Sequence, residues 1–231
     1  MRIQLSDHFT YGRLLRFTLP SMIMMVFTSI YGMVDGFFIS NFVGKTPFAA
    51  INLIYPMFMI IGSVGMMLGA GGTAVIGKTL GEGKRELANK YFSMVVYVVL
   101  AFGAFSAIIA LFLLRTVAQA LGAEGEMLEN CVKYGRILCP ALPFLMIQFS
   151  TQSFFVVAEK PKLGLVATLL GGGTNMVLDA LFVAVFKWGL QGAAAATAIS
   201  QLVTAGFALI YFSRKNTSLL KLTLKTKIYG K

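Results

Sequence analysis

Two acidic residues lie inside long apolar runs of this sequence, and they are the first candidates for chemistry. Asp35 interrupts the run 17–44, and Asp179 interrupts the run 163–186. A carboxylate in the middle of a membrane costs about 2.5–3.5 kcal/mol on insertion scales. A carboxylate that reaches the membrane surface or pairs with a basic residue is the structural alternative. Because so costly a group is seldom kept without a use, both residues predict a functional site.

The spacing from nearby basic residues places three polar residues at one depth. Asp35 lies ten residues before Lys45. Asp179 lies eight residues before Lys187, and Thr197 lies ten residues after it. Because every residue of a helix adds the same rise, we expect all three at a similar level in the outer half of the membrane.

Asn175 adds an amide to this group, because it precedes Asp179 by one helical turn and shares its face. Carboxyl groups close together in a buried place can hold a proton, and the same oxygen atoms suit a hard cation. We therefore predict a cation- or proton-binding site at Asp35, Asn175, Asp179 and Thr197, in which the two aspartates can also bind sodium. No basic residue interrupts the middle of an apolar run, which favours an exchangeable cation over a fixed ion pair.

Three further polar residues are candidates for a substrate cavity, namely Gln148, Gln152 and Tyr31. The two glutamines are four residues apart and share a helix face, although hydrogen bonds between helices explain them equally well. The sequence shows no arrangement of a nucleophile with a neighbouring base. We therefore expect no enzymatic activity, and no cofactor other than the coupling ion, a proton or sodium.

These residues need elements that can cross a membrane. Of the 231 residues, 57% are hydrophobic and 13% are charged, whereas soluble domains have about 25% charged residues. A helix of about 20 apolar residues spans the hydrocarbon layer. Six such runs predict an all-α polytopic membrane protein with six transmembrane helices, at residues 17–44, 46–77, 91–114, 137–158, 163–186 and 188–213.

The basic residues between the runs predict the orientation. With the N-terminus inside, the inner segments hold fifteen of the twenty Lys and Arg residues. Cytoplasmic loops carry this excess, so we expect both termini in the cytoplasm and the chain in the plasma membrane. These loops, which face anionic lipids, explain the net charge of +11 without a nucleic-acid partner. Glu124, Glu126 and Glu129 are expected in an outer loop.

Small residues and prolines predict how the helices pack and bend. The pairs Gly32–Gly36, Gly65–Gly69 and Gly77–Gly81 have a spacing of four, which lets membrane helices approach closely. Pro20, Pro56, Pro140 and Pro143 are expected to kink the first, second and fourth helices.

Four stretches of the sequence match motifs of one transporter family. They are LP at 19–20, VDGFFISNFVG at 34–44, GKTLGEGK at 77–84, and NMVLD at 175–179 followed by GAAAAT at 192–197. Through them the chain resembles the N-terminal half of a multidrug and toxic compound extrusion (MATE) transporter, in the flippase superfamily. The resemblance implies export of organic, often cationic, compounds in exchange for protons or sodium. It also implies a cation site at Asp35, Asn175, Asp179 and Thr197.

The MATE family normally has twelve helices in two lobes, and six helices correspond to one lobe. We expect residues 1–213 to form this lobe and residues 214–231 to be a basic cytoplasmic tail that resembles the linker between lobes. Because six spans return the chain to the same side, a homodimer or a separate second lobe is the expected partner. A lipid-linked oligosaccharide flippase is an alternative that the absence of basic residues within the spans disfavours. An inactive fragment or a non-transporting assembly subunit is an alternative of another class.

Overall fold

The computed structural model describes residues 11–214 and 218–223, so the predictions for Arg2 and for tail residues 215–217 and 224–231 lie outside the described residues. Within these described residues, six helical segments are long and apolar enough to cross a membrane, which confirms the predicted fold class. The helices are α1 (Tyr11–Phe38), α2 (Lys45–Gly81), α3 (Arg85–Ala120), α4 (Gly125–Leu138), α5 (Leu142–Val157), α6 (Pro161–Asp179) and α7 (Gly189–Ser213), with α4 and α5 forming the fourth span together.

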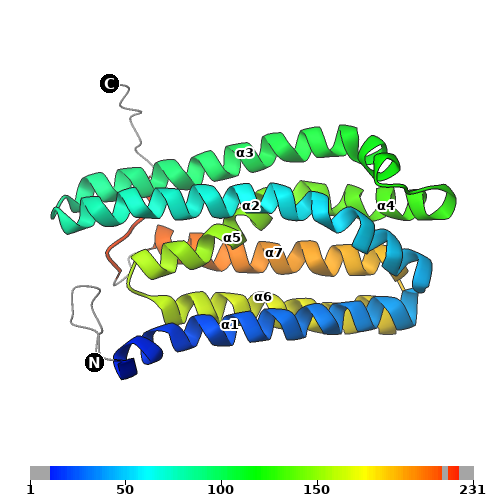
Figure 1. The fold of residues 1–231 in the computed structure, drawn as a ribbon, viewed down its shortest axis with the longest axis horizontal. Coiled ribbons are helices and arrows are strands. Elements are labelled where there is room, and N and C mark those ends of the chain that lie inside the picture. The colour runs from blue at the N-terminus through cyan, green and yellow to red at the C-terminus, as the bar shows by residue number, and fades with distance from the viewer. Residues whose placement is uncertain (1–10, 215–217, 224–231) are drawn as a thin grey trace.

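The helices run along one long axis and form a bundle (Figure 1). α2 and α3 lie along one edge, α1 and α6 lie along the opposite edge, and α5 and α7 lie between them. We call the end with the α2–α3 and α5–α6 turns the inner end and the opposite end the outer end, after the orientation that the basic residues predict. This arrangement brings α1, α6 and α7 together, and they carry the predicted cation-site residues.

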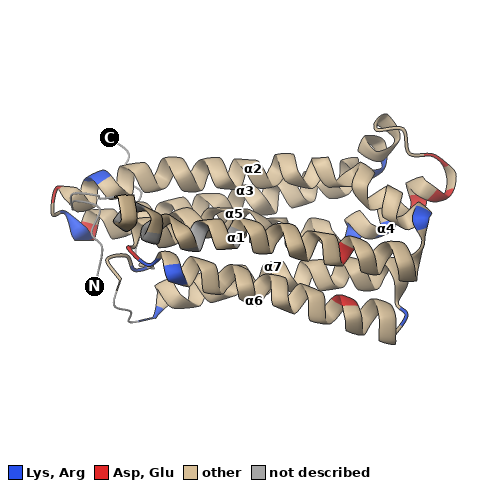
Figure 2. Ribbon diagram, turned by 60° about the horizontal axis from the view of Figure 1, so that its bottom comes forward, with Lys and Arg blue, Asp and Glu red and all other residues tan. Residues whose placement is uncertain are grey.

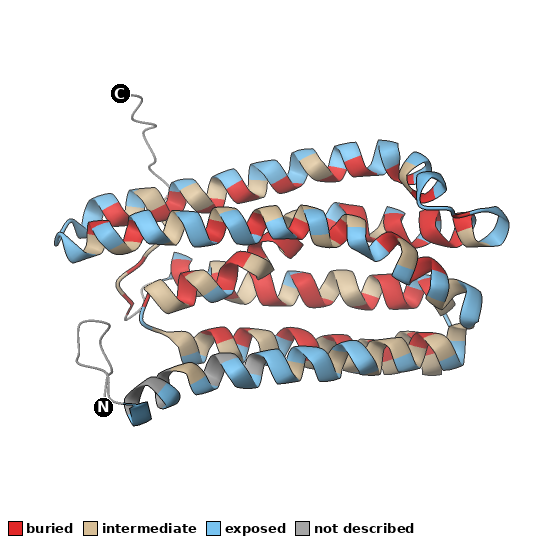
Figure 3. Ribbon diagram, in the orientation of Figure 1, coloured by how far each residue is buried: buried red, intermediate tan, exposed pale blue. Residues whose placement is uncertain are grey.

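The surface of the bundle matches the needs of a lipid environment. Charged residues gather at the two ends, and the acidic positions within the length of the bundle lie on α1 and α6 (Figure 2). The outward faces of the helices are exposed along the bundle (Figure 3), and large apolar side chains such as Met25, Met33 and Phe112 lie on them. An apolar surface of this length fits a hydrocarbon layer about 30 Å thick, so the chain is an integral membrane protein.

The fourth span begins at Gly125 and not at residue 137, so Glu126 and Glu129 belong to α4 and the prediction of an outer loop is wrong for them. α4 is amphipathic: it carries charged residues on one side while Leu128 and Cys131 are buried on the other. The mean hydropathy of a sequence window does not detect such a helix, because the low hydropathy of its charged residues offsets the high hydropathy of its apolar face. A 3₁₀ turn at Cys139–Ala141 separates α4 from α5 and contains Pro140, which confirms the predicted kink.

Close packing between α2 and α5 depends on the pair Gly65 and Gly69. A Cβ atom at Gly65 would lie 2.7 Å from the Cα atom of Met146, and one at Gly69 would lie 2.8 Å from the Cβ atom of Ser150. The Ser150 hydroxyl donates a hydrogen bond of 2.7 Å to the Gly65 carbonyl oxygen. The packing prediction is therefore confirmed for this pair, whereas Gly32 and Gly81 face open space and the prediction is wrong for them.

Residues 218–223, which we call the strap, return along the inner end of α3. The Arg85 guanidinium donates hydrogen bonds to the carbonyl oxygens of Ser218 (2.8 Å) and Leu219 (3.2 Å). Further hydrogen bonds join the strap to Asn89 (2.9 Å), Ser93 (2.8 Å) and Phe212 (2.8 Å), and Leu220 is fully buried among inner-end aromatic residues. The strap thus ties α3 to the end of α7.

We expect Arg85→Ala to loosen the strap, because the substitution removes two hydrogen bonds from a charged donor. Trypsin should then cut after Lys221 about ten times faster, which corresponds to about 1.4 kcal/mol of lost protection when cleavage follows the open population. Lys84→Ala is the control, since the Lys84 side chain pairs with Glu82 in the exposed turn. Equal cleavage rates for Arg85→Ala and the unmodified chain, measured by mass spectrometry, would contradict this role.

Candidate cation site

Asp35 and Asp179 meet in the outer half of the bundle, between α1 and α6. Asp179 is the last residue of α6 and is completely buried, and a π-helical turn follows it at Ala180–Val185. Asp35 is half-buried on α1, which continues into another π-helical turn at Ile39–Val43. The two carboxyl groups are near neighbours, close enough for each to respond to the charge of the other. Single π-helical turns occur often at functional sites.

Oxygen atoms without a hydrogen-bond partner concentrate at this place. Within the described part of the chain, both carboxylate oxygens of Asp179, Oδ1 of Asp35 and Oδ1 of Asn175 are buried and unbonded. A buried acceptor without a donor costs about 1–3 kcal/mol, and more when it is charged. Such a group calls for an additional partner, which can be a proton on one carboxyl group, a water molecule or a metal cation.

Three tyrosines surround the carboxyl groups. Tyr31 lies on α1 one turn before Asp35, Tyr55 lies on α2, and Tyr134 lies on α4 and is 2% exposed. All three are close enough to feel the charge of Asp35, and the Tyr134 hydroxyl lies near that of Thr197. Tyr134 therefore lies near both the carboxyl groups and α7.

Tyr55 and Tyr134 were not among the residues predicted from the sequence. Tyr134 lies between Lys133 and Arg136, in a segment that averaged hydropathy assigns to an outer loop. The helical period of the buried residues of α4 is a signal that could have found it, because that period places Tyr134 on the buried face. Tyr55 offers no comparable signal, since it lies in a long and uniformly apolar helix.

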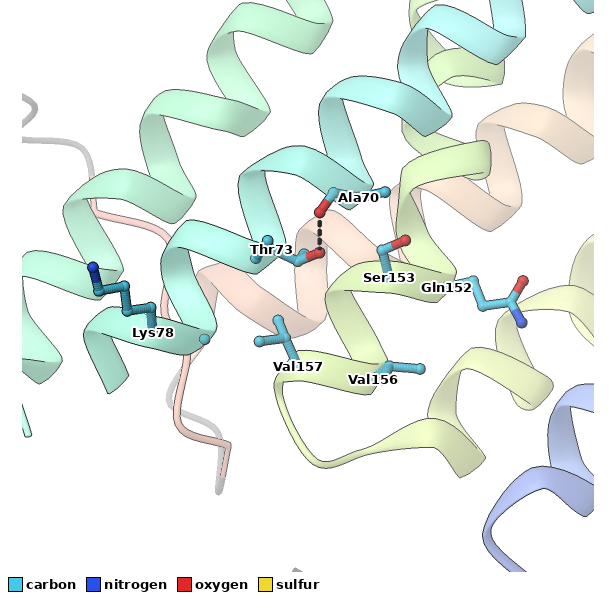
Figure 4. Close-up of a pocket in the computed structure, with 9 residues that line it drawn as sticks. Ala70, Thr73, Lys78, Gln152, Ser153, Val156 and Val157 are labelled. Carbon is cyan, nitrogen blue, oxygen red and sulfur yellow. Dashed lines mark hydrogen bonds between the residues drawn. The ribbon is translucent and has the colours of Figure 1, made fainter. Parts of the chain in front are cut away.

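The predicted substrate-cavity residues lie on α1 and α5, and of the three only Gln152 lines the groove between α2 and α5. Tyr31 belongs to the carboxylate group, and Gln148 is half-buried on α5 with its Oε1 atom unbonded within the described part of the chain. Gln152 is exposed and lines an open groove of about 570 Å³ between α2 and α5, together with Thr73, Ser153 and Lys78 (Figure 4). A role for these residues in substrate binding stays a prediction.

The arrangement of oxygen atoms inside a membrane bundle can be compared with known proteins. The MatE family profile matches residues 20–181, a range that contains Asp35, Asn175 and Asp179. This chain belongs to the MatE family. The resemblance seen in the sequence motifs is thereby confirmed.

Relatives of this MatE chain are multidrug exporters. The protein called "Multidrug export protein MepA" of Staphylococcus haemolyticus is 31% identical over 209 residues, which are 90% of this chain and 46% of that protein. A crystal structure of MATE in the bent conformation has a TM-score of 0.84 at 27% identity and covers 94% of this chain and 48% of the other. An outward-facing MATE family multidrug resistance transporter also gives a TM-score of 0.84 at 27% identity, over 95% of this chain and 51% of the other.

The MatE chain thus spans about half the length of the relatives that it matches. Its six helices superimpose on part of a transporter, and it is similar to proteins that export drugs. The family accounts for a membrane protein, and the relatives described above are named as exporters.

Proposed function

We propose that this MatE chain supplies one six-helix lobe of an exporter that moves organic cations out of the cell in exchange for protons or sodium ions. The observation that carries the proposal is the group of unbonded oxygen atoms of Asp35, Asn175 and Asp179. A bound cation supplies the partner that these oxygen atoms lack. Asp35, Asn175, Asp179 and Thr197 are the proposed binding residues, and the two aspartates provide the negative charge.

Exchange of the organic cation for a proton or sodium ion follows from the electrostatics of carboxyl groups in a site with little water. While the carboxyl groups are charged, the lobe attracts a cationic substrate, because charges interact strongly at low dielectric. When a proton or sodium ion binds, it neutralises the carboxyl groups and weakens that attraction. The two ligands then favour different states of the protein, which is the condition for coupling them.

The proposal includes a second lobe, because this chain covers 46% of the first relative described above. A second copy of the chain or a separate six-helix chain can fill this role. We place the assembly in the plasma membrane, with both termini in the cytoplasm.

Reconstitution of the purified chain in liposomes tests the function. A fluorescent organic cation should move against its own gradient when a proton gradient or a sodium gradient is imposed, and separate experiments with each gradient identify the coupling ion. Cross-linking in the same vesicles reports whether two copies are present. A chain that forms dimers but moves no organic cation under either gradient would contradict transport by a homodimer. Co-reconstitution with a separate second lobe then tests the other arrangement.

A further inference from the structure

Gln201 is a buried polar residue that the cation site does not use. It lies on α7 and is 5% exposed, and its Oε1 atom is buried with no hydrogen-bond partner in the described ranges. It follows Thr197 by four residues, so both side chains lie on one face of the helix, with Gln201 one turn closer to the inner end.

The packing of α6 against α7 places Gln201 next to the cation site. A Cβ atom at Gly171 would meet the side chain of Thr204 and the carbonyl oxygen of Ser200. α6 and α7 run in opposite directions and rise equally per residue. Asn175, four residues outward of Gly171 on α6, therefore lies opposite the turn of α7 that is just outward of Gln201. The unbonded oxygen atoms of Asn175 and Gln201 therefore follow one another along the α6–α7 interface.

The hydroxyl groups on this part of α7 offer only lone pairs to the interior. Thr197, Ser200 and Thr204 each donate their proton to a carbonyl oxygen of α7 itself, at 3.0, 2.8 and 3.0 Å. On the opposite helix, Gly171 and its neighbour Gly172 have no side chain that could donate a hydrogen bond. Apart from the side-chain amide groups of Asn175 and Gln201, the side chains named here thus offer only acceptor atoms to the interface.

α5 adds one more acceptor at the same level. Phe155 packs against Phe207 and Phe212 of α7, with ring centroids 6.2 and 5.0 Å apart. Because α5 and α7 both run towards the inner end, Gln148, seven residues before Phe155, comes level with residues 200–205 of α7. Its buried Oε1 atom is also unbonded in the described part of the chain.

We propose that Thr197, Gln201 and Thr204 of α7, with Gln148 of α5, form an acceptor-lined path for the coupling cation from the carboxyl groups towards the inner end. Water molecules held by these oxygen atoms carry a proton, or the oxygen atoms coordinate sodium directly, since acceptor atoms stabilise both a hydrated proton and a sodium ion. This inference rests on the proposed cation exchange and adds the route by which the cation leaves.

Trp188 provides a way to test the path. It is the single tryptophan of the chain, and it stacks at 4.8 Å on Phe182, which follows Asp179 by three residues. Its fluorescence in lipid nanodiscs should change when a cation binds at the carboxyl groups. Equilibrium titrations give the binding midpoint, and stopped-flow jumps in pH or in sodium concentration give the rate for each cation separately.

Gln201→Leu should slow the fluorescence response about tenfold, or by about 1.4 kcal/mol in barrier, while the binding midpoint stays within about twofold of the unmodified chain. Thr204→Val, which keeps the shape and removes one acceptor, should act in the same direction. Gln119→Leu is the matched control, because Gln119 is exposed at the outer end of α3, and it should change neither value.

The outcomes separate the path from the site. Unchanged rates for both Gln201→Leu and Thr204→Val would overturn the path and leave the cation site intact. A slowed response in Gln119→Leu of equal size would also overturn it, since the effect would then not depend on the buried acceptors. A fluorescence response that persists in Asp179→Asn would instead contradict the proposed function.

Discussion

Asp179→Asn is expected to abolish cation-driven efflux, with a loss of at least about 100-fold, which corresponds to about 2.7 kcal/mol. Asparagine keeps the size of the side chain and removes its charge. Asp179 is completely buried, and both its oxygen atoms lack a donor in the described part of the chain. A charge in such a place interacts strongly with a bound cation, so an uncharged amide cannot replace it.

The measurement is efflux of a fluorescent organic cation from liposomes that contain a transport-competent assembly. Asp35→Asn should impair efflux similarly, because the two carboxyl groups interact directly. Glu129→Gln is the matched control, since Glu129 is a half-exposed carboxylate at the outer end that pairs with Arg115 at 3.0 Å. Efflux at the normal rate in Asp179→Asn would rule out the site as the coupling centre.

Gly65→Val is expected to have the largest effect on folding, with a loss of about 3 kcal/mol. Its side chain would lie 2.7 Å from both the Cα atom and the carbonyl oxygen of Met146. These are backbone atoms, so rotation of a side chain cannot relieve the contact. α2 and α5 would have to separate, which would also break the hydrogen bond from Ser150 to the Gly65 carbonyl.

This loss of stability is measured by heating the protein in detergent and recording the fraction that remains monodisperse at each temperature. Gly71→Val provides the control on the same helix, because a Cβ atom at Gly71 meets no atom within 4 Å. Both variants add the same β-branched side chain to α2, so their intrinsic helix propensities cancel in the comparison. Equal stabilities of the two variants would show that the α2–α5 contact is not close in the folded protein.

The sequence alone determined the number of spans and singled out the residues of the proposed cation site. Long apolar runs must become helices in a membrane, because every backbone polar group has to bond within its own segment. The cost of a buried carboxylate singled out Asp35 and Asp179. Counting residues from Lys45 and Lys187 was sufficient to predict that they share one depth, since the rise of a helix is constant.

The tertiary structure alone decided which polar groups find a partner. Gln148 and Gln152 are alike in the sequence, yet one has a buried unbonded oxygen atom and the other faces an open groove. Tyr134 lies near the carboxyl groups because the buried face of α4 turns towards them, and Gln201 lies in the proposed path because α6 brings glycines to α7. Hydropathy is a local property, because it is averaged over residues that are adjacent in the chain. Hydrogen bonds and interactions between charges depend instead on neighbours that the fold brings from other helices.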